Sequence, residues 1–303
     1  MYRSVSLNGM RIGRGVFWCG AVVLVACVLS ACRNAPLADM TRLTDARQRA
    51  ADAFVQFVKT ADAGNRAVMA DTDETSETFA QEAEVAADAV SHDAESLTEL
   101  LRSLGYSDES RVLQEFTGRF AEYRALDRTI LQLAVENTNL KAQKLSFGPA
   151  QVEADSFRDA LGKIAMPAGA SSDCGVQANI ATAVAAVREV QALQAPHIAE
   201  SDEAAMTRLE ARTARAEAEA RRPMALLAGV VPPESRSKLA EATAALDRFM
   251  ALNGQIVTLS RRNSNVRSLA LSLGQKRTLT AACEERLIAL QDALARRGFT
   301  GTR

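Results

Sequence analysis

An internal repeat is the feature that most constrains how this chain can fold. Shifting the sequence by 126 residues places ALDRTILQLAVENTNLKAQKLSFG (Ala125–Gly148) over ALNGQIVTLSRRNSNVRSLALSLG (Ala251–Gly274). Nine of these 24 positions are identical, far more than chance gives. The identical residues of the first copy are Ala125, Leu126, Ile130, Leu133, Asn137, Asn139, Leu145, Ser146 and Gly148. Weaker matches upstream extend the repeat over most of both halves, so each half is expected to be one structural unit of about 120 residues.

Within each copy the apolar residues recur every third or fourth position, which is the spacing of one helix face. This stripe runs from Leu113 to Leu140 in the first copy and from Leu239 to Val266 in the second. The composition agrees, because 16 Gly and 7 Pro in 303 residues are too few for the turns of an all-β chain. The fold class is therefore predicted to be all-α, with two tandem antiparallel units that are each like a four-helix bundle.

Glycines, prolines and capping residues indicate the expected helix ends. Helices are expected near residues 40–70, 74–104, 108–146, 150–165, 175–195, 198–222, 233–272 and 276–298. Gly148 and Gly274 are expected to end long helices, because glycine readily adopts a left-handed conformation. The predicted organisation is a signal segment (1–31), a tether (32–40), helical unit A (41–165), a linker (166–174), helical unit B (175–298) and a tail (299–303).

The first 31 residues have the organisation of a secretory signal peptide. A segment with three arginines precedes an apolar run, Val16–Leu29, that is too short to span a bilayer as a helix. The run ends in Leu29-Ser30-Ala31-Cys32, which resembles the lipobox of bacterial lipoproteins. This resemblance implies cleavage before Cys32 and acylation of that residue, and two or three acyl chains anchor a protein stably.

The expected location is the periplasmic side of a bacterial membrane, with the protein held there by its acyl chains. Arg33 follows Cys32, whereas an Asp at that position retains enteric lipoproteins in the inner membrane, so the outer membrane is favoured. Only Cys174 and Cys283 then remain, and in an oxidising compartment such a pair suggests a disulfide. The sequence does not place the two cysteines within bonding distance, so a bridge and two free thiols both stay open.

A second resemblance covers part of each repeat. The segment FTGRFAEYRALDRTILQLAVENTNLKAQKLSFGPAQVEADSFRDAL (Phe116–Leu161) resembles the third and fourth helices of the sensory module of methyl-accepting chemotaxis receptors, and Leu246–Leu294 is similar. The resemblance implies a four-helix bundle that binds small molecules or partner proteins between its helices. The sequence has no second membrane helix and no cytoplasmic signalling hairpin, so we do not expect it to pass a signal across the membrane by itself.

Two asparagines on the apolar stripes are the best candidates for a binding site. Asn137 and Asn263 are expected to face the core, where a buried amide needs a hydrogen-bond partner. Lys141 and Arg267 follow at i+4 on the same side of each helix. One interpretation is a polar pocket in each unit that takes a small anionic or zwitterionic ligand.

The alternative is an interhelix hydrogen-bond network in which Asn137 and Asn263 fix the helix register, as buried asparagines do in coiled coils. Asn139 and Asn265 lie off the apolar stripe, and their recurrence is interpreted as packing of one unit on the other.

Other kinds of chemistry find little support in the sequence. His92 and His197 stand in different contexts and are interpreted as surface residues, which leaves no di-iron, haem or other metal site. No nucleophile with a base, no paired acid and base and no phosphate-binding loop follows from the motifs, so no cofactor and no enzyme activity are expected. The chain has 36 basic and 37 acidic residues, a balance that argues against binding nucleic acid.

The predicted function is that of a membrane-anchored, non-catalytic module that binds a solute or acts as a sensory accessory. The alternative is a structural or adaptor lipoprotein that binds envelope proteins through its helical surface. An exposed apolar patch without a pocket would favour the alternative.

Overall fold

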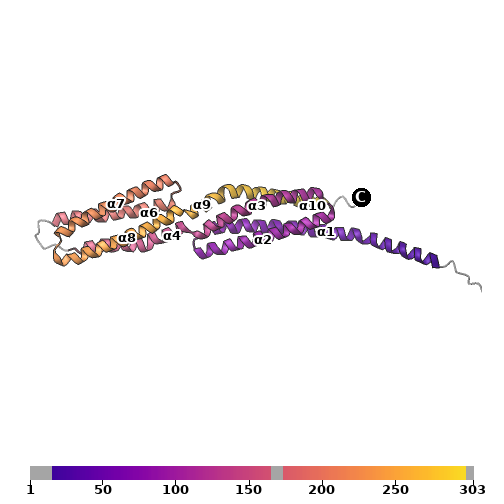
Figure 1. Cartoon of the computed structure of the whole chain (residues 1–303), viewed down its shortest axis with the longest axis horizontal. Coiled ribbons are helices and arrows are strands. Elements are labelled where there is room, and N and C mark those ends of the chain that lie inside the picture. Colours follow the sequence, from indigo (N-terminus) through magenta and orange to yellow (C-terminus); the bar gives the residue numbers. More distant parts are fainter. Residues whose placement is uncertain (1–15, 165–172, 298–303) are drawn as a thin grey trace, which may run out of the picture. The chain divides into compact units, whose positions relative to one another are not determined.

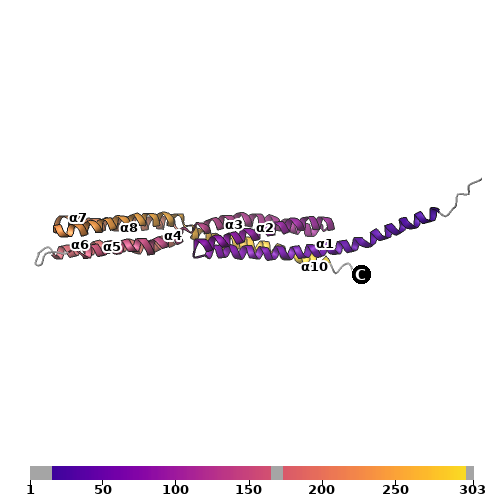
Figure 2. The same cartoon turned by 90° about the horizontal axis from the view of Figure 1, so that it is seen from below.

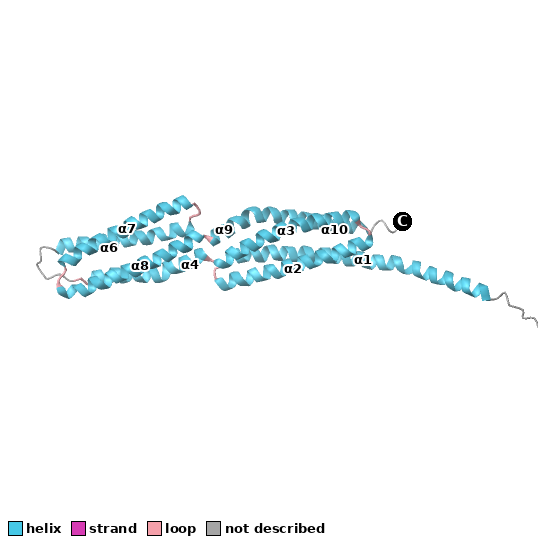
Figure 3. Ribbon diagram, in the orientation of Figure 1, coloured by secondary structure: helices cyan, strands magenta, loops and turns pink. Residues whose placement is uncertain are grey.

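The computed structural model describes the backbone of residues 16–164 and 173–297, and the side chains in these ranges from residue 38 onward, Asp173 excepted. Within these ranges every regular element is helical, as Figure 3 shows, so the predicted all-α class is confirmed. The elements are α1 (Val16–Met69), α2 (Asp73–Leu104), α3 (Ser107–Glu136), α4 (Thr138–Leu145), η1 (Ser146–Ala150), α5 (Gln151–Gly162), α6 (Asp173–Ala199), α7 (Glu203–Val230), η2 (Pro233–Ser235), α8 (Arg236–Arg262), α9 (Ser264–Leu271), η3 (Ser272–Lys276) and α10 (Arg277–Arg297).

The predicted signal segment and lipidation site lie outside the described side chains. The backbone of α1 runs through the expected cleavage position before Cys32. Most of the expected linker (166–174), apart from Asp173 and Cys174 at the start of α6, and all of the expected tail (299–303) also fall outside the described residues. Among the helices that could be examined in the described part of the chain, none is long and apolar enough to cross a membrane.

Local capping explains several helix ends. Gly105 follows α2 with a φ of 70°, a left-handed conformation that glycine adopts without strain. The Asp202 carboxylate accepts a hydrogen bond of 2.6 Å from the Ala205 backbone N–H and so caps α7. The expectation that prolines mark helix ends near 195 and 222 is wrong, because Pro196 and Pro223 lie inside α6 and α7. Pro223 is one of the buried residues of α7.

The two long helices of the repeat differ from the prediction at their ends. Each was expected to run without a break to Gly148 or Gly274, but a single residue, Asn137 or Asn263, interrupts each helix earlier. At Gly148 and Gly274 the helical path continues through one wider π-helical turn, η1 and η3, and neither glycine has a positive φ. The expected left-handed glycine caps are therefore absent, since a π turn lets the chain continue in helical form.

In Figures 1 and 2, α6, α7 and α8 lie beside the continuous helical path of α4, η1 and α5. Apolar side chains from α5, α6, α7 and α8 form their common core. Members of this core include Phe157, Leu161, Val187, Val190, Met224, Leu227, Leu246, Phe249 and Ile256. Helix α5 contacts α8 and α6, so a helix of predicted unit A completes a bundle of helices from predicted unit B.

The compact units of the chain do not coincide with the predicted boundaries of 41–165 and 175–298. One unit contains the described residues up to Val55, Ala89–Thr117 and the described residues from Glu284, and the other contains Gln56–Asp88 and Gly118–Cys283. In the first unit α10 packs against α1, where the Arg47 guanidinium donates to the Leu294 carbonyl at 3.1 Å. The helical path does not reverse at either π turn. For this reason α5, from predicted unit A, packs on helices of predicted unit B, and α10, from predicted unit B, packs on α1.

Candidate functional site

The two recurring asparagines occupy the breaks in the long helices. Asn137 lies between α3 and α4 with φ 49° and ψ 37°, and Asn263 lies between α8 and α9 with φ 54° and ψ 37°. These values belong to the left-handed region, which asparagine tolerates better than other residues with a Cβ. Their recurrence in the sequence therefore has a backbone reason. Both side chains are buried, as predicted.

Around these breaks, positions 126 residues apart bind each other reciprocally. The Thr138 and Ser264 backbone N–H groups each donate to the other residue's hydroxyl at 3.0 Å. The Asn139 and Asn265 backbone N–H groups donate to each other's side-chain oxygens at 3.1 and 3.2 Å. These hydrogen bonds join α4 to α9 within one compact unit.

The asparagine side chains complete this network, which we call the crossing network. Asn265 Nδ2 donates to Asn137 Oδ1 and Asn139 Nδ2 donates to Asn263 Oδ1, each at 2.8 Å. Asn263 Nδ2 also donates to the Glu200 carbonyl at 2.8 Å. The Asn137 Nδ2 group is buried without such a partner. Most of the amide groups are used between helices, which favours the register interpretation over a solute pocket.

The basic residues of the expected pocket make other contacts. Lys141 Nζ donates to the Glu136 carbonyl at 2.9 Å and lies 3.6 Å from an Asp73 carboxylate oxygen. Arg267 is exposed. Arg262 pairs with Glu136, and its hydrogen bonds hold the pKa of Glu136 below the usual 4.5. The cationic groups thus surround Glu136 at the end of α3.

A buried ion pair that the sequence did not predict joins the π turn η3 to α3. Lys276 Nζ is 2.7 Å from Asp127 Oδ1, and the ammonium lies 5.7 Å from the centre of the Tyr123 ring. Burial raises the pKa of Asp127, and Lys276 opposes this rise. Burial also raises the pKa of Tyr123, whose hydroxyl has no hydrogen-bond partner among the described residues. Gly64 of α1 makes room for the pair, because a Cβ there would overlap Lys276 Nζ.

The corresponding positions in the other copy hold neutral groups. Asn253 lies 126 residues after Asp127, and Ala150 lies 126 residues before Lys276. Gln194 Nε2 donates to Asn253 Oδ1 at 3.0 Å, and Ser146 Oγ donates to Gln194 Oε1 at 2.7 Å. The sequence signal for this pair was the Asp127 that stands where the other copy has Asn253. The sequence alone did not show that the charges of Asp127 and Lys276 are both buried.

His197 is buried, which corrects its assignment to the surface; His92 is exposed as expected. His197 Nε2 lies 3.0 Å from Glu210 Oε1, across the turn that joins α6 to α7. Glu210 also accepts two hydrogen bonds from Arg261, at 2.7 and 3.0 Å. The hydrogen bond from Arg261 is the main reason that the pKa of Glu210 lies below 4.5, and that from His197 adds to it.

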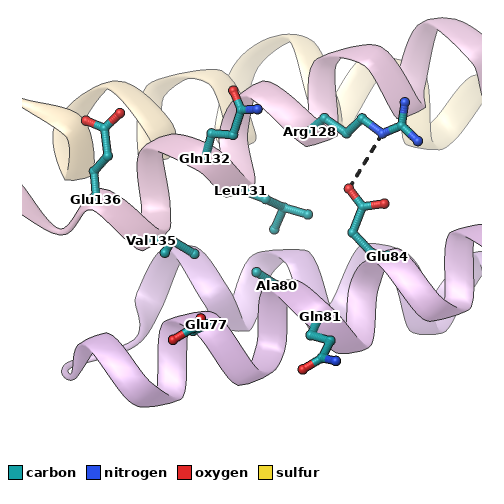
Figure 4. A pocket seen from close by; sticks show the side chains of 9 residues that line it. All are labelled: Glu77, Ala80, Gln81, Glu84, Arg128, Leu131, Gln132, Val135 and Glu136. Carbon is teal, nitrogen blue, oxygen red and sulfur yellow. Dashed lines mark ion pairs between the residues drawn. The ribbon is translucent and has the colours of Figure 1, made fainter.

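A groove opens between α2 and α3 and has a volume of 990 Å³. Figure 4 shows Leu131 and Val135 of α3 directed toward Ala80 of α2, with an ion pair at one end where Arg128 Nε lies 3.6 Å from Glu84 Oε1. Its lining residues are Glu77, Ala80, Gln81, Glu84, Arg128, Leu131, Gln132, Val135 and Glu136. The groove thus combines an apolar floor with a rim that carries three carboxylates and one guanidinium.

Cys174 and Cys283 form no disulfide in the part of the chain that the structure describes. Cys174 is exposed in the first turn of α6, and Cys283 is buried in α10, so the suggested disulfide is absent from the structure. No group of three or more His, Cys, Asp or Glu side chains in the described ranges is placed to hold a metal ion.

Comparison with family models, with curated proteins and with solved structures gives no significant match for this chain.

Proposed function

We propose that this protein is a membrane-anchored, non-catalytic helical module that binds a small solute in the groove between α2 and α3. The observation that carries the proposal is the difference between the two candidate sites. The amides of the crossing network bind one another and the backbone, whereas the groove offers 990 Å³ of open volume. A volume of several hundred Å³ with an apolar floor and a few polar groups is typical of small-molecule sites.

The same groove supports a binding role better than a catalytic one. Its lining contains Glu, Gln and Arg beside apolar residues, and no Ser, Cys, Lys or His that could act as a nucleophile or a histidine base. The basic and acidic groups closest to each other, Arg128 and Glu84, already form an ion pair. The charged side chains of the groove are therefore better suited to orienting a bound ligand than to reacting with it.

The α2–α3 groove is tested by a ligand screen on the full chain. Thermal unfolding is followed with a panel of amino acids, organic acids, amines and neutral metabolites, because a ligand at 100 times its Kd adds about 2.7 kcal/mol of stability. Ala80→Phe fills the groove and is expected to abolish the shift, while Ala214→Phe, at an exposed position of α7, retains it. A panel without any hit, or a hit that Ala80→Phe leaves unchanged, contradicts the proposal.

The membrane anchor is a separate part of the proposal and has its own test. In a bacterium with lipoprotein-processing enzymes, the chain is expected to incorporate an alkyne-labelled fatty acid and to fractionate with membranes. Cys32→Ser removes the acylated thiol and is expected to abolish both. Cys27→Ser serves as the matched control, because it changes a cysteine of the same segment outside the lipobox. Label that persists in Cys32→Ser contradicts acylation at this residue.

An adaptor function is the second candidate, and the two π turns favour it. Phe147 in η1 and Leu273 in η3 are 126 residues apart, and 74% and 67% of their surfaces are exposed. Large apolar side chains exposed at equivalent positions are suited to a protein contact. A photo-crosslinking amino acid at Phe147 is expected to give one defined envelope-protein adduct, and the same group at the exposed Val85 is expected to give none. Equal labelling from both positions contradicts a specific contact.

A further inference from the structure

The α7–α8 pair shows which group occupies the place that is open between α2 and α3. There, Arg261 of α8 extends toward α7 and donates to both carboxylate oxygens of Glu210, at 2.7 and 3.0 Å. It also donates to the Thr207 hydroxyl at 2.9 Å. A guanidinium of the protein itself thus lies between these two helices.

The equivalent positions of α2 and α3 lack this guanidinium. Val135 lies 126 residues before Arg261 in the sequence. Counted from the first residue of each helix, Ala80 of α2 corresponds to Glu210 of α7, and Glu77 corresponds to Thr207. In the first copy the carboxylate is therefore that of Glu77, at the position of Thr207, and the apolar Val135 stands where the second copy has Arg261. The groove thus has no guanidinium at the position that corresponds to Arg261.

The carboxylate of Glu77 has no basic partner among the residues that the structure describes. The other two acids of the groove are already engaged. Glu84 lies 3.6 Å from Arg128 and 3.8 Å from Arg124, and Glu136 is held by Arg262. A ligand that enters the groove thus meets one unpaired negative charge beside the apolar surface of Ala80, Leu131 and Val135.

We infer that the α2–α3 groove binds a small amphiphilic cation, whose guanidinium or ammonium group pairs with Glu77 and whose apolar body lies on Leu131 and Val135. This inference rests on the proposed function and names its ligand class. An anion is disfavoured by the unpaired carboxylate of Glu77, and a small hydrophilic cation leaves the apolar floor uncovered. This cation differs from the small anionic or zwitterionic ligand expected from Lys141 and Arg267.

The test uses three probes of the same shape and different charge: phenylbutylguanidinium, its neutral urea analogue and phenylbutyrate. Binding to the full chain in lipid nanodiscs is measured by isothermal titration calorimetry, with empty nanodiscs as the blank. The guanidinium is expected to bind at least about tenfold more tightly than the urea, because a charge-assisted hydrogen bond contributes at least about the free energy of one tenfold step. Equal affinities for the three probes overturn the inference.

Two substitutions locate the charge. Glu77→Gln keeps the side-chain size and is expected to weaken guanidinium binding about tenfold while the urea affinity stays unchanged. Glu219→Gln, which neutralises an exposed acid of α7, is the matched control and is expected to change neither affinity. A Glu77→Gln variant with undiminished preference for the cation contradicts the assignment.

A third substitution supplies the missing cation from the protein. Val135→Arg places a guanidinium at the position that corresponds to Arg261 and is expected to abolish binding of the cationic probe, while Val135→Met, similar in length and neutral, retains it. Circular dichroism confirms that both variants stay folded. If the neutral or anionic probe binds at least as tightly as the cationic probe and Ala80→Phe blocks it, the proposed function holds and the cation inference fails. If no compound binds in the groove, both fail.

Discussion

Lys276 Nζ lies 2.7 Å from Asp127 Oδ1, and only 2% and 5% of the two side chains are exposed. The pair joins η3 to α3 at a place where the other copy of the repeat has Ala150 and Asn253. Buried charges are stabilising only when both partners are present, since each alone retains its desolvation cost. The pair therefore holds η3 in one position on α3.

Removing one partner of this pair is expected to destabilise the protein strongly. Lys276→Met leaves Asp127 buried and unpaired, with an expected loss of about 3–5 kcal/mol in the free energy of unfolding. The double variant Asp127→Asn with Lys276→Ala carries the neutral residues of the other copy and is expected to lose less than Lys276→Met alone. Chemical denaturation measures both. A double variant that is less stable than the single one contradicts the role of uncompensated charge.

Gly64 is expected to tolerate a methyl group better when Lys276 is absent. A Cβ at this position overlaps Lys276 Nζ and lies 3.1 Å from Asp127 Oδ1, so Gly64→Ala displaces the ammonium from its partner. In the Lys276→Ala background the overlap with Nζ is removed and the 3.1 Å contact with Asp127 Oδ1 stays, so the same substitution is expected to cost less than in the wild type, helped by the preference of alanine over glycine in a helix. A double-mutant cycle from denaturation curves gives the coupling. Additive effects of the two substitutions would show that the ion pair does not need the glycine.

The asparagine breaks are expected to be more sensitive to alanine than to glycine. Alanine at a left-handed position costs about 1–2 kcal/mol, which glycine avoids. Asn263→Ala is expected to be more destabilising than Asn137→Ala, because the Asn263 amide donates to Glu200 whereas Asn137 Nδ2 has no partner. Unfolding free energies of the four alanine and glycine variants check this order. If alanine and glycine are equivalent at both positions, backbone conformation is not the reason for the asparagines.

The stability contribution of Glu210 is expected to depend on pH. Hydrogen bonds from Arg261 and His197 lower the pKa of Glu210 below the 4.5 of an unperturbed glutamate. The folded protein therefore binds this proton less readily than the unfolded chain, so the stabilisation is fully present above the unfolded pKa and is lost as pH falls through the folded pKa. The difference in unfolding free energy between wild type and Glu210→Gln is expected to shrink over this acid range. A difference that stays constant there contradicts an ionised Glu210.

The two described cysteines are expected to react at different rates. Cys174 is exposed and Cys283 is buried, so a thiol reagent should modify only Cys174 of this pair in the folded protein. The full chain and its Cys174→Ala variant are expected to differ by one fast-reacting thiol. The full chain and Cys283→Ala should differ only after denaturant is added. Wild type that shows neither thiol until a reductant is present would indicate the bridge that the structure lacks.

Local sequence patterns were sufficient for some parts of this protein. Apolar spacing of three and four predicted the helical class, and the start of α2 and the burial of Asn137 follow the expectation closely. The repeat also identified the asparagines as unusual. It could not show that they interrupt the helices, because one left-handed residue leaves the apolar spacing on either side nearly unchanged.

Tertiary structure decided which helices meet and which charges are buried. The sequence patterns predicted that helices adjacent in the chain pack on one another, but α5 packs on α8 and α10 packs on α1. A π turn can replace the expected helix end without a distinct signal in composition, so the direction of the chain after Gly148 was not predictable from local patterns. The Asp127–Lys276 pair and the open groove depend on residues brought together from distant segments. Apolar spacing determines that a helix has a buried face, whereas the partner of that face is selected only by the packing of the whole chain.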